Sequence, residues 1–203
     1  MSKKKIAVTG GIGSGKSTVM NYLQTKGFPV FSCDEIYKEI IQSPAYIEEI
    51  KKCFPTAITE GKVDRKALSA LVFNDERARE RLNQIAHPLI MKELIARMNQ
   101  SESPLVFVEV PLLFEANLEN VFDEILVIMR PKENRKEAVA LRDGLSFEEI
   151  EARMNAQFDY QSAEGQKRLQ KSGAIQIIND QTQKELEQEL ENWLNTQNVK
   201  QLT

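Results

Sequence analysis

The sequence predicts an α/β fold, a doubly wound parallel sheet of about five strands that carries two helical insertions. Three observations support this: short apolar segments, amphipathic helices between them, and a glycine-rich turn directly after the first segment. The apolar segments are Ile6–Thr9, Pro29–Phe31, Leu105–Val108, Ile125–Ile128 and Ile175–Ile178. Most are apolar throughout, which is typical of strands in a parallel sheet that is covered on both faces.

Two of the predicted helices have clear start signals. Ser146 with Glu149, and Thr182 with Glu185, match the Ser/Thr-x-x-Glu pattern of a capping box. The apolar stripes expected along these helices are Phe147, Ile150, Met154 and Phe158 in the first, and Leu186, Leu190, Trp193 and Leu194 in the second. Their helical spacing predicts that each helix buries one face against the core.

Two segments are longer than a simple connection between strands requires. Residues 35–103 are mostly helical in pattern, with breaks expected at Pro44, Pro55 and Pro88, and residues 131–171 are polar and helical. Insertions at strand ends lie where α/β proteins bind ligands, so we expect a substrate-binding region and a lid. Helical decoration without a binding role is the alternative. The core of this single domain would then comprise about 1–34, 104–130 and 172–203.

Composition excludes several classes of protein. Hydrophobic residues make up 41% of the chain, enough for a core, and the net charge of -3 gives no field that attracts nucleic acid or a membrane surface. No apolar segment is long enough for a membrane span or a signal peptide. Cys33 and Cys53 provide no disulfide framework. We therefore expect a cytoplasmic protein, and the lack of a heptad pattern favours a monomer.

The glycine-rich turn matches the phosphate-binding pattern G-x-x-x-x-G-K-S/T in full. The turn and the residue after it are Gly10, Gly11, Ile12, Gly13, Ser14, Gly15, Lys16, Ser17 and Thr18. Glycines let backbone N–H groups close around phosphate oxygens, and the following helix points its positive dipole end at them. Lys16 supplies a cation for the β and γ phosphates, and the Ser17 hydroxyl can bind Mg²⁺. The turn predicts a P-loop fold that binds ATP.

The rest of the chain favours a kinase over a GTPase switch, because it lacks the Asn-Lys-x-Asp and Asp-x-x-Gly sequences of that class. Asp34 follows the second predicted strand, where a carboxylate can accept the proton of an acceptor hydroxyl; a helix N-cap is an equally good interpretation. Glu109 ends the third predicted strand, where it would assist Mg²⁺ through water or only solvate the strand end. A nucleotide-binding regulatory module with little turnover is the remaining alternative.

Four segments, the phosphate loop among them, agree in pattern with one kinase family. These are the phosphate loop from Thr9, Gly61–Leu68 with Val72 and Phe73, His87–Ile90, and Val110–Glu115, which reads Val-Pro-Leu-Leu-Phe-Glu. Together they resemble the dephospho-coenzyme A kinase family, whose members phosphorylate the 3′-hydroxyl of the dephospho-CoA ribose in the last step of coenzyme A biosynthesis. The resemblance covers most of the chain. It implies a P-loop kinase-type fold, ATP and dephospho-CoA as substrates, and Mg²⁺.

The resemblance also implies roles for single residues. Asp34 corresponds to the acidic residue that serves the family as catalytic base, and Arg142 to a lid cation that reaches the ATP phosphates on closure. His87 and Pro88 correspond to the substrate pocket. The residues alone favour a capping or packing role for His87, because Pro88 should end or kink its helix, and only the resemblance favours the substrate pocket. Asn179 is expected on the adenine side of the ATP site.

Three consecutive residues of the signature, Leu112, Leu113 and Phe114, form an apolar ledge beside a strand end. They are expected to face the pantetheine and adenine of the acceptor, or else to lie in the core.

The sequence departs from the family at several positions. Ser32-Cys33-Asp34 keeps only the second of two acids, and Lys38 replaces an arginine. A second lid arginine is absent because Ala138 occupies its place, and Arg135 lies nearby but off register. These changes leave the set of lid cations open. Another small-molecule or nucleoside monophosphate kinase is the closest rival function.

Overall fold

The computed structural model of the protein describes residues 3–73 and 75–197. The chain divides into two compact units. The first unit contains the segments up to Val30 and from Ser101 onward, and the second is Phe31–Gln100.

The main sheet has five strands in the order β2-β5-β1-β6-β7, and four of them, β5, β1, β6 and β7, lie wholly in the first unit. The strands are β1 (Lys4–Thr9), β2 (Val30–Ser32), β5 (Leu105–Glu109), β6 (Glu124–Met129) and β7 (Ile175–Ile178). The central strand β1 pairs in parallel with β5 and β6, and β6 pairs in parallel with β7. All five predicted strands are confirmed. Residues 6–9, 105–108 and 125–128 are buried throughout, which explains why these parts of β1, β5 and β6 show no alternation of polar and apolar residues.

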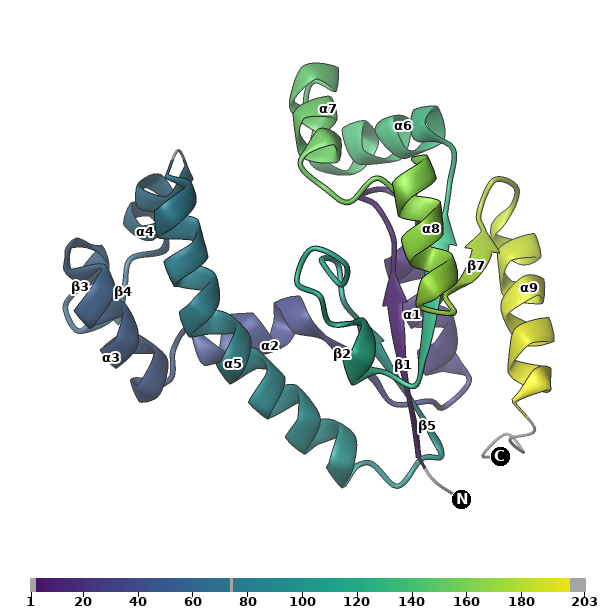
Figure 1. Ribbon diagram of the computed structural model, residues 1–203, viewed down its shortest axis with the longest axis horizontal. Helices are drawn as coiled ribbons and strands as arrows, with labels where there is room; N and C mark the ends of the chain where they lie inside the picture. The colour runs from purple at the N-terminus through teal and green to yellow at the C-terminus, as the bar shows by residue number, and fades with distance from the viewer. Residues whose placement is uncertain (1–2, 74, 198–203) are drawn as a thin grey trace. The chain divides into compact units, whose positions relative to one another are not determined.

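Helices surround this sheet. They are α1 (Lys16–Thr25), α6 (Lys132–Asp143), α7 (Phe147–Asn155), α8 (Ala163–Lys171) and α9 (Gln183–Thr196), with a 3₁₀ turn η2 at Glu119–Val121. Helices α1 and α9 contribute Leu23, Leu190 and Trp193 to the main hydrophobic cluster. Figure 1 shows α6 and α7 above the carboxyl end of β1, where the phosphate loop lies.

Both predicted capping boxes are present, at Ser146 with Glu149 and at Thr182 with Glu185. The predicted stripe of the first helix is only partly correct. Helix α7 ends at Asn155, so Phe158 lies outside it, in the linker to α8. Phe158 instead stacks on Phe114, with ring centroids 4.7 Å apart. Helical spacing did not reveal the early end of the helix.

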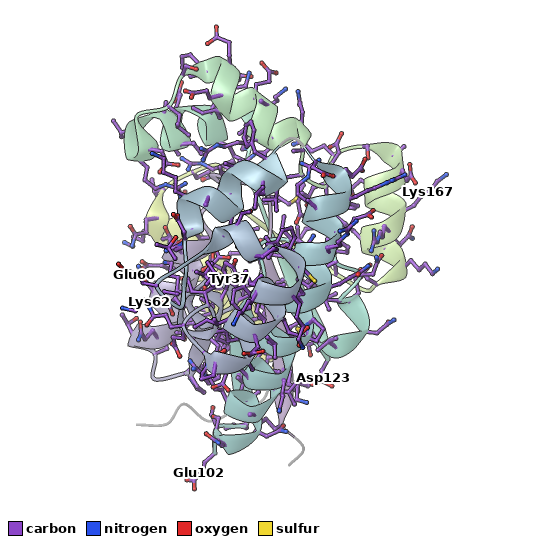
Figure 2. All side chains as sticks on the ribbon, turned by 90° about the vertical axis from the view of Figure 1, so that its left-hand side faces the viewer. Tyr37, Glu60, Lys62, Glu102, Asp123 and Lys167 are labelled. Carbon is purple, nitrogen blue, oxygen red and sulfur yellow. The ribbon has the colours of Figure 1, made fainter. Side chains whose placement is uncertain are left out.

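The second unit is mainly helical. Its elements are α2 (Cys33–Ile40), α3 (Pro44–Cys53), η1 (Pro55–Ala57), β3 (Ile58–Thr59), β4 (Lys62–Val63), α4 (Arg65–Phe73) and α5 (Glu76–Gln100). Helices α2, α3 and α4 all contact the long helix α5, as Figure 1 shows. The antiparallel pair β3–β4 was not predicted. Figure 2 shows Glu60 and Lys62 at the edge of this unit, beside that hairpin turn.

Pro88 does not end its helix. Helix α5 has 25 residues and runs through Pro88, so this expected break is wrong. Proline removes one backbone N–H, which leaves the Gln84 carbonyl without its usual partner four residues later. Packing of α2, α3 and α4 along α5 outweighs this local cost. Despite its length α5 is too polar to cross a membrane, and no other helix among residues 3–73 and 75–197 is suited to do so.

Candidate active site

The phosphate loop connects the buried end of β1 to the first turn of α1. Gly13 and Gly15 adopt φ angles of 76° and 99°, which L residues with a side chain rarely adopt. A Cβ at Gly13 would also lie 2.6 Å from the Arg135 carbonyl oxygen. Lys16 is buried, and its Nζ donates to the Gly10 and Gly11 carbonyls at 2.8 and 3.2 Å. The loop is therefore shaped by its own lysine and by helix α6.

Two side chains from neighbouring strand ends support the loop. Asn179, just after β7, donates from Nδ2 to the Ser14 carbonyl at 2.7 Å. Arg130, just after β6, donates from Nη1 to the Gly13 carbonyl at 3.4 Å. Asn179 thus lies at the predicted ATP site, where the structure shows it holding the loop. Its contact with ATP stays a prediction.

Arg135 of α6 is a cation from the 131–171 insertion that the structure places at the loop. A Cβ on Gly11 would lie 2.1 Å from Arg135 Nη1, so the guanidinium covers the loop backbone. Burial lowers the pKa of Arg135, and the nearby Asp159 and Tyr160 oppose that effect. Its Nε, like the Ser14 hydroxyl, is a buried polar atom without a hydrogen-bond partner. A half-buried guanidinium and a buried hydroxyl beside loop amides are suited to an anion such as phosphate.

Arg142 lies near the end of α6 and is exposed. Its Nε and Nη2 donate to the two carboxylate oxygens of Asp143 at 2.7 and 2.8 Å. This ion pair raises the pKa of Arg142, and Glu109 adds a smaller effect in the same direction. The predicted contact of Arg142 with ATP phosphates stays a prediction, because it requires the guanidinium to leave Asp143.

The linker between α7 and α8 contributes two contacts that sequence reasoning missed. Gln157 Oε1 accepts a hydrogen bond from the Ile12 backbone N–H at 2.7 Å. Tyr160 Oη lies 3.1 Å from Thr9 Oγ1, and both side chains are buried. Burial raises the pKa of Tyr160 to about 12. No sequence motif marks these residues, because their role depends on how the linker folds back over the loop.

A cavity of about 370 Å³ adjoins the loop at Gly11. Its lining combines the end of β6, the start of α6 and the α7–α8 linker, and includes Met129, Arg130, Arg135, Gln157, Phe158 and Tyr160. The whole lining offers three cations, three side-chain amides and two aromatic rings, together with the single carboxylate of Asp159. This chemistry suits a ligand with both anionic and planar parts.

The oxygen atoms predicted to serve Mg²⁺ lie at the same edge of the sheet. Ser17 is the second residue of α1 and is exposed, and Thr18 follows it. Glu109 ends β5, where it pairs in register with Val8 of β1. Across the described ranges no group of three acidic, His or Cys side chains could hold a metal. A hydroxyl and one carboxylate fit Mg²⁺, which commonly binds few protein ligands and otherwise nucleotide phosphates and water.

The three apolar residues of the signature segment have different environments. Leu113 and Phe114 are fully buried, whereas Leu112 is 48% exposed. The core interpretation therefore holds for Leu113 and Phe114 in this structure. Leu112 alone offers surface to a ligand.

Asp34 and His87 belong to the second unit. Helix α2 begins at Cys33 with Ser32 as its N-cap, so the N-cap interpretation of Asp34 is wrong. Asp34 is exposed in the first turn of α2, two residues after β2. His87 is half-buried within α5, next to the exposed Pro88, so it does not cap a helix end. The roles of these three residues toward a substrate stay predictions.

His87 is expected to make stability depend on pH. Burial lowers its pKa in the folded state, so below its ordinary pKa of about 6.5 the unfolded chain binds the proton more readily. The free energy of unfolding should therefore fall as the pH drops below about 6.5, by at most about 1.4 kcal/mol per pH unit. Urea denaturation at pH 7.5 and 5.5 should show a smaller drop for His87→Gln than for wild type. An equal drop in both proteins would contradict this assignment.

Comparisons with known proteins agree on one family. The sequence model of the family described as Dephospho-CoA kinase matches residues 4–194. A Dephospho-CoA kinase of Thermus thermophilus is 41% identical over 152 residues, which cover 75% of this chain and 74% of the relative.

Solved structures give the same result. The crystal structure of TT1252 from Thermus thermophilus has a TM-score of 0.83 at 35% identity, covering 98% of this chain and 100% of that one. Dephospho-CoA kinase from Campylobacter jejuni has a TM-score of 0.62 at 29% identity, covering 96% and 97%. These similarities confirm the predicted P-loop kinase-type fold.

Proposed function

The chain belongs to the dephospho-CoA kinase family, as its sequence predicted, and we propose how its residues carry out that family's reaction. The reaction is the ATP-dependent phosphorylation of dephospho-CoA in coenzyme A biosynthesis, which makes the chain a transferase. The acceptor is the ribose 3′-hydroxyl, and the products are coenzyme A and ADP. The observation that supports this most strongly is the phosphate loop, with the buried Lys16 and the half-buried Arg135 beside it.

On the donor side, the ATP phosphates lie in the Gly10–Thr18 loop against its backbone N–H groups and the start of α1. Lys16 exchanges its bonds to loop carbonyls for bonds to the β and γ phosphates. Arg135 faces the same phosphates from α6, and Arg142 joins them when it leaves Asp143. Spreading charge over these cations stabilises a loose transition state, and a closed lid excludes water.

Mg²⁺ would be held by the Ser17 hydroxyl, with Glu109 acting through water, and would neutralise charge on the β and γ phosphates. The protein's own contribution at this position is to hold these two oxygens at one edge of the sheet.

On the acceptor side, Asp34 orients the 3′-hydroxyl and accepts its proton as the phosphoryl group is transferred. His87 and Pro88 organise the pocket for dephospho-CoA, and Leu112 contributes exposed apolar surface to it. Leu113 and Phe114 support that segment from within the core. Asn179 serves ATP through the loop carbonyl that it holds.

The experiment that tests this function incubates the full chain with ATP, Mg²⁺ and dephospho-CoA and detects coenzyme A by mass. ADP release with shikimate, nucleoside monophosphates and dephospho-CoA as separate acceptors tests the rival small-molecule kinase. Coenzyme A formation with dephospho-CoA alone is the expected result. ATP consumption only with another acceptor would favour the rival, and no consumption at all would favour a regulatory module.

The two lid arginines should differ in importance. We expect Arg135→Met to lower kcat about 10- to 100-fold, the effect of losing a hydrogen bond to a charged group. Arg142→Met should lose less, because Arg142 must first leave Asp143 whereas Arg135 already covers the loop. Steady-state turnover of both variants checks this order. A larger loss for Arg142→Met would identify Arg142 as the main transition-state cation.

We also infer a cytoplasmic monomer that takes ATP and dephospho-CoA and binds neither nucleic acid nor membrane. The small net charge supports this, and so does a count of only two cysteines, which is too few for a disulfide framework.

A further inference from the structure

We propose that Gln157 is a positioning residue for the phosphate loop and that the Phe158–Glu115 hydrogen bond ties its position to the Pro111–Glu115 segment. The inference rests on nucleotide binding at the loop, which is part of the proposed function. It concerns a connection within the first unit, between the donor loop and the segment that carries the family signature.

Ile12 of the phosphate loop makes two contacts with the 131–171 insertion, one through its backbone and one through its side chain. Its backbone N–H donates to Gln157 Oε1 at 2.7 Å. Its side chain packs against the small hydrophobic cluster of Val139, Ile150 and Met154 in α6 and α7. Inside the loop, the Ser14 N–H donates to the Gly11 carbonyl at 3.1 Å, so a shift of Ile12 strains a tight turn. Gln157 therefore fixes the position of the phosphate loop at Ile12.

The residue after Gln157 connects the linker to the signature segment. The Phe158 backbone N–H donates to Glu115 Oε1 at 2.7 Å. The Phe158 ring stacks on the fully buried Phe114, with an interplanar angle of 21°, and Tyr160 packs edge-on against both rings. These contacts make the linker and the signature segment one packed body, because offset-stacked and edge-on rings resist relative displacement.

Arg168 of α8 stabilises the packing between the linker and the signature segment by contacting residues of both. Its guanidinium lies 5.4 Å from the Phe114 ring centroid and 5.6 Å from that of Phe158. Nη2 donates to the Phe114 carbonyl at 2.7 Å, and the guanidinium forms an ion pair with Glu119. Arg168 thus contacts both rings, the Phe114 backbone and Glu119. These contacts limit the positions that Phe158, and therefore Gln157, can take.

The second anchor of the linker is Tyr160. Its hydroxyl bonds to Thr9, the last residue of β1, at a fully buried position. Gln157 and Tyr160 thus hold the loop on both sides of Gly10 and Gly11, whose carbonyls receive Lys16. Loss of either end of the Glu115–Phe158–Gln157 connection should weaken nucleotide binding without removing any phosphate ligand.

The test measures the Kd of the full chain for a Mg-ATP analogue with a non-hydrolysable β,γ bridge, by titration calorimetry. Gln157→Met keeps the size of the side chain but loses the amide oxygen, and we expect it to raise the Kd about fivefold. Glu115→Ala should raise the Kd about two- to threefold although Glu115 does not touch the loop. The double variant should have the same Kd as Gln157→Met alone, because both changes break the same connection.

Matched controls distinguish a specific loss of nucleotide affinity from a general loss of structure. Gln170→Met on the exposed side of α8, and Glu102→Ala before β5, labelled in Figure 2, should leave the Kd unchanged. Glu115→Gln keeps an acceptor for the Phe158 N–H and should restore wild-type affinity. An unchanged Kd in Gln157→Met, additive effects in the double variant, or failure of Glu115→Gln to restore affinity would overturn the proposal. If wild type itself does not bind the analogue, the proposed function fails instead.

Discussion

Replacing Lys16 with alanine is expected to lower kcat for coenzyme A formation roughly 10²–10³-fold, the effect of removing one preorganised group that stabilises transition-state charge. Lys16 is the buried cation at the centre of the loop, bonded to the Gly10 and Gly11 carbonyls. No other loop residue carries a positive charge, so none can replace it. Steady-state turnover with ATP and dephospho-CoA measures the loss.

The matched control for this variant is Lys184→Ala, which removes an exposed lysine from α9. It should retain wild-type kcat. Far-UV circular dichroism should show the same helix content for both variants. Wild-type turnover in folded Lys16→Ala would remove Lys16 from the donor site.

The second large effect is expected for Asp34→Asn, which should lower kcat roughly 10²–10⁴-fold, the usual contribution of a general base. Asparagine keeps the shape of the side chain and loses the charge that accepts a proton. In the first turn of α2 this change also loses a favourable interaction with the helix dipole, worth about 0.3–1 kcal/mol. Such a loss is too small to unfold a domain of ordinary stability.

The neighbouring Glu35 provides the control for Asp34, because it lies in the same helical turn and is also exposed. Glu35→Gln should keep wild-type kcat. The KM for ATP should change little in Asp34→Asn, since the proposed role concerns the acceptor. An Asp34→Asn enzyme with wild-type kcat would exclude Asp34 as the base.

The sheet and the phosphate loop were predictable because their signals are local. A buried parallel strand such as β6 reads as one apolar run, and the loop is a contiguous pattern between a strand and a helix. Capping boxes are equally local, which is why Ser146 and Thr182 mark helix starts correctly. The acceptor came from the resemblance of segments such as Val110–Glu115 to one family, because the chemistry of these residues does not by itself specify dephospho-CoA.

The remaining site residues depend on tertiary arrangement. Arg135 reaches the loop because α6 turns one face toward Gly11 and Gly13, and spacing within α6 does not say which face that is. Gln157 belongs to a linker that folds back over Ile12, and nothing in its sequence distinguishes it from other glutamines. At Pro88 the local signal itself was misleading. Proline predicts a break in the helix, but packing of other helices along α5 keeps the helix continuous.

The order of strands in the sheet has a consequence for synthesis of the protein. The residues that pair with β1 come about a hundred positions later in the chain, as Lys4 with Leu105 and Ile6 with Glu124 show. Pairing between such distant segments is slow, and β1 leaves the ribosome long before its partners. The contiguous Phe31–Gln100 unit can form its own local contacts in the interval. ATP binding is thus gained late in translation, and nascent chains that end before β6 should not retain nucleotide.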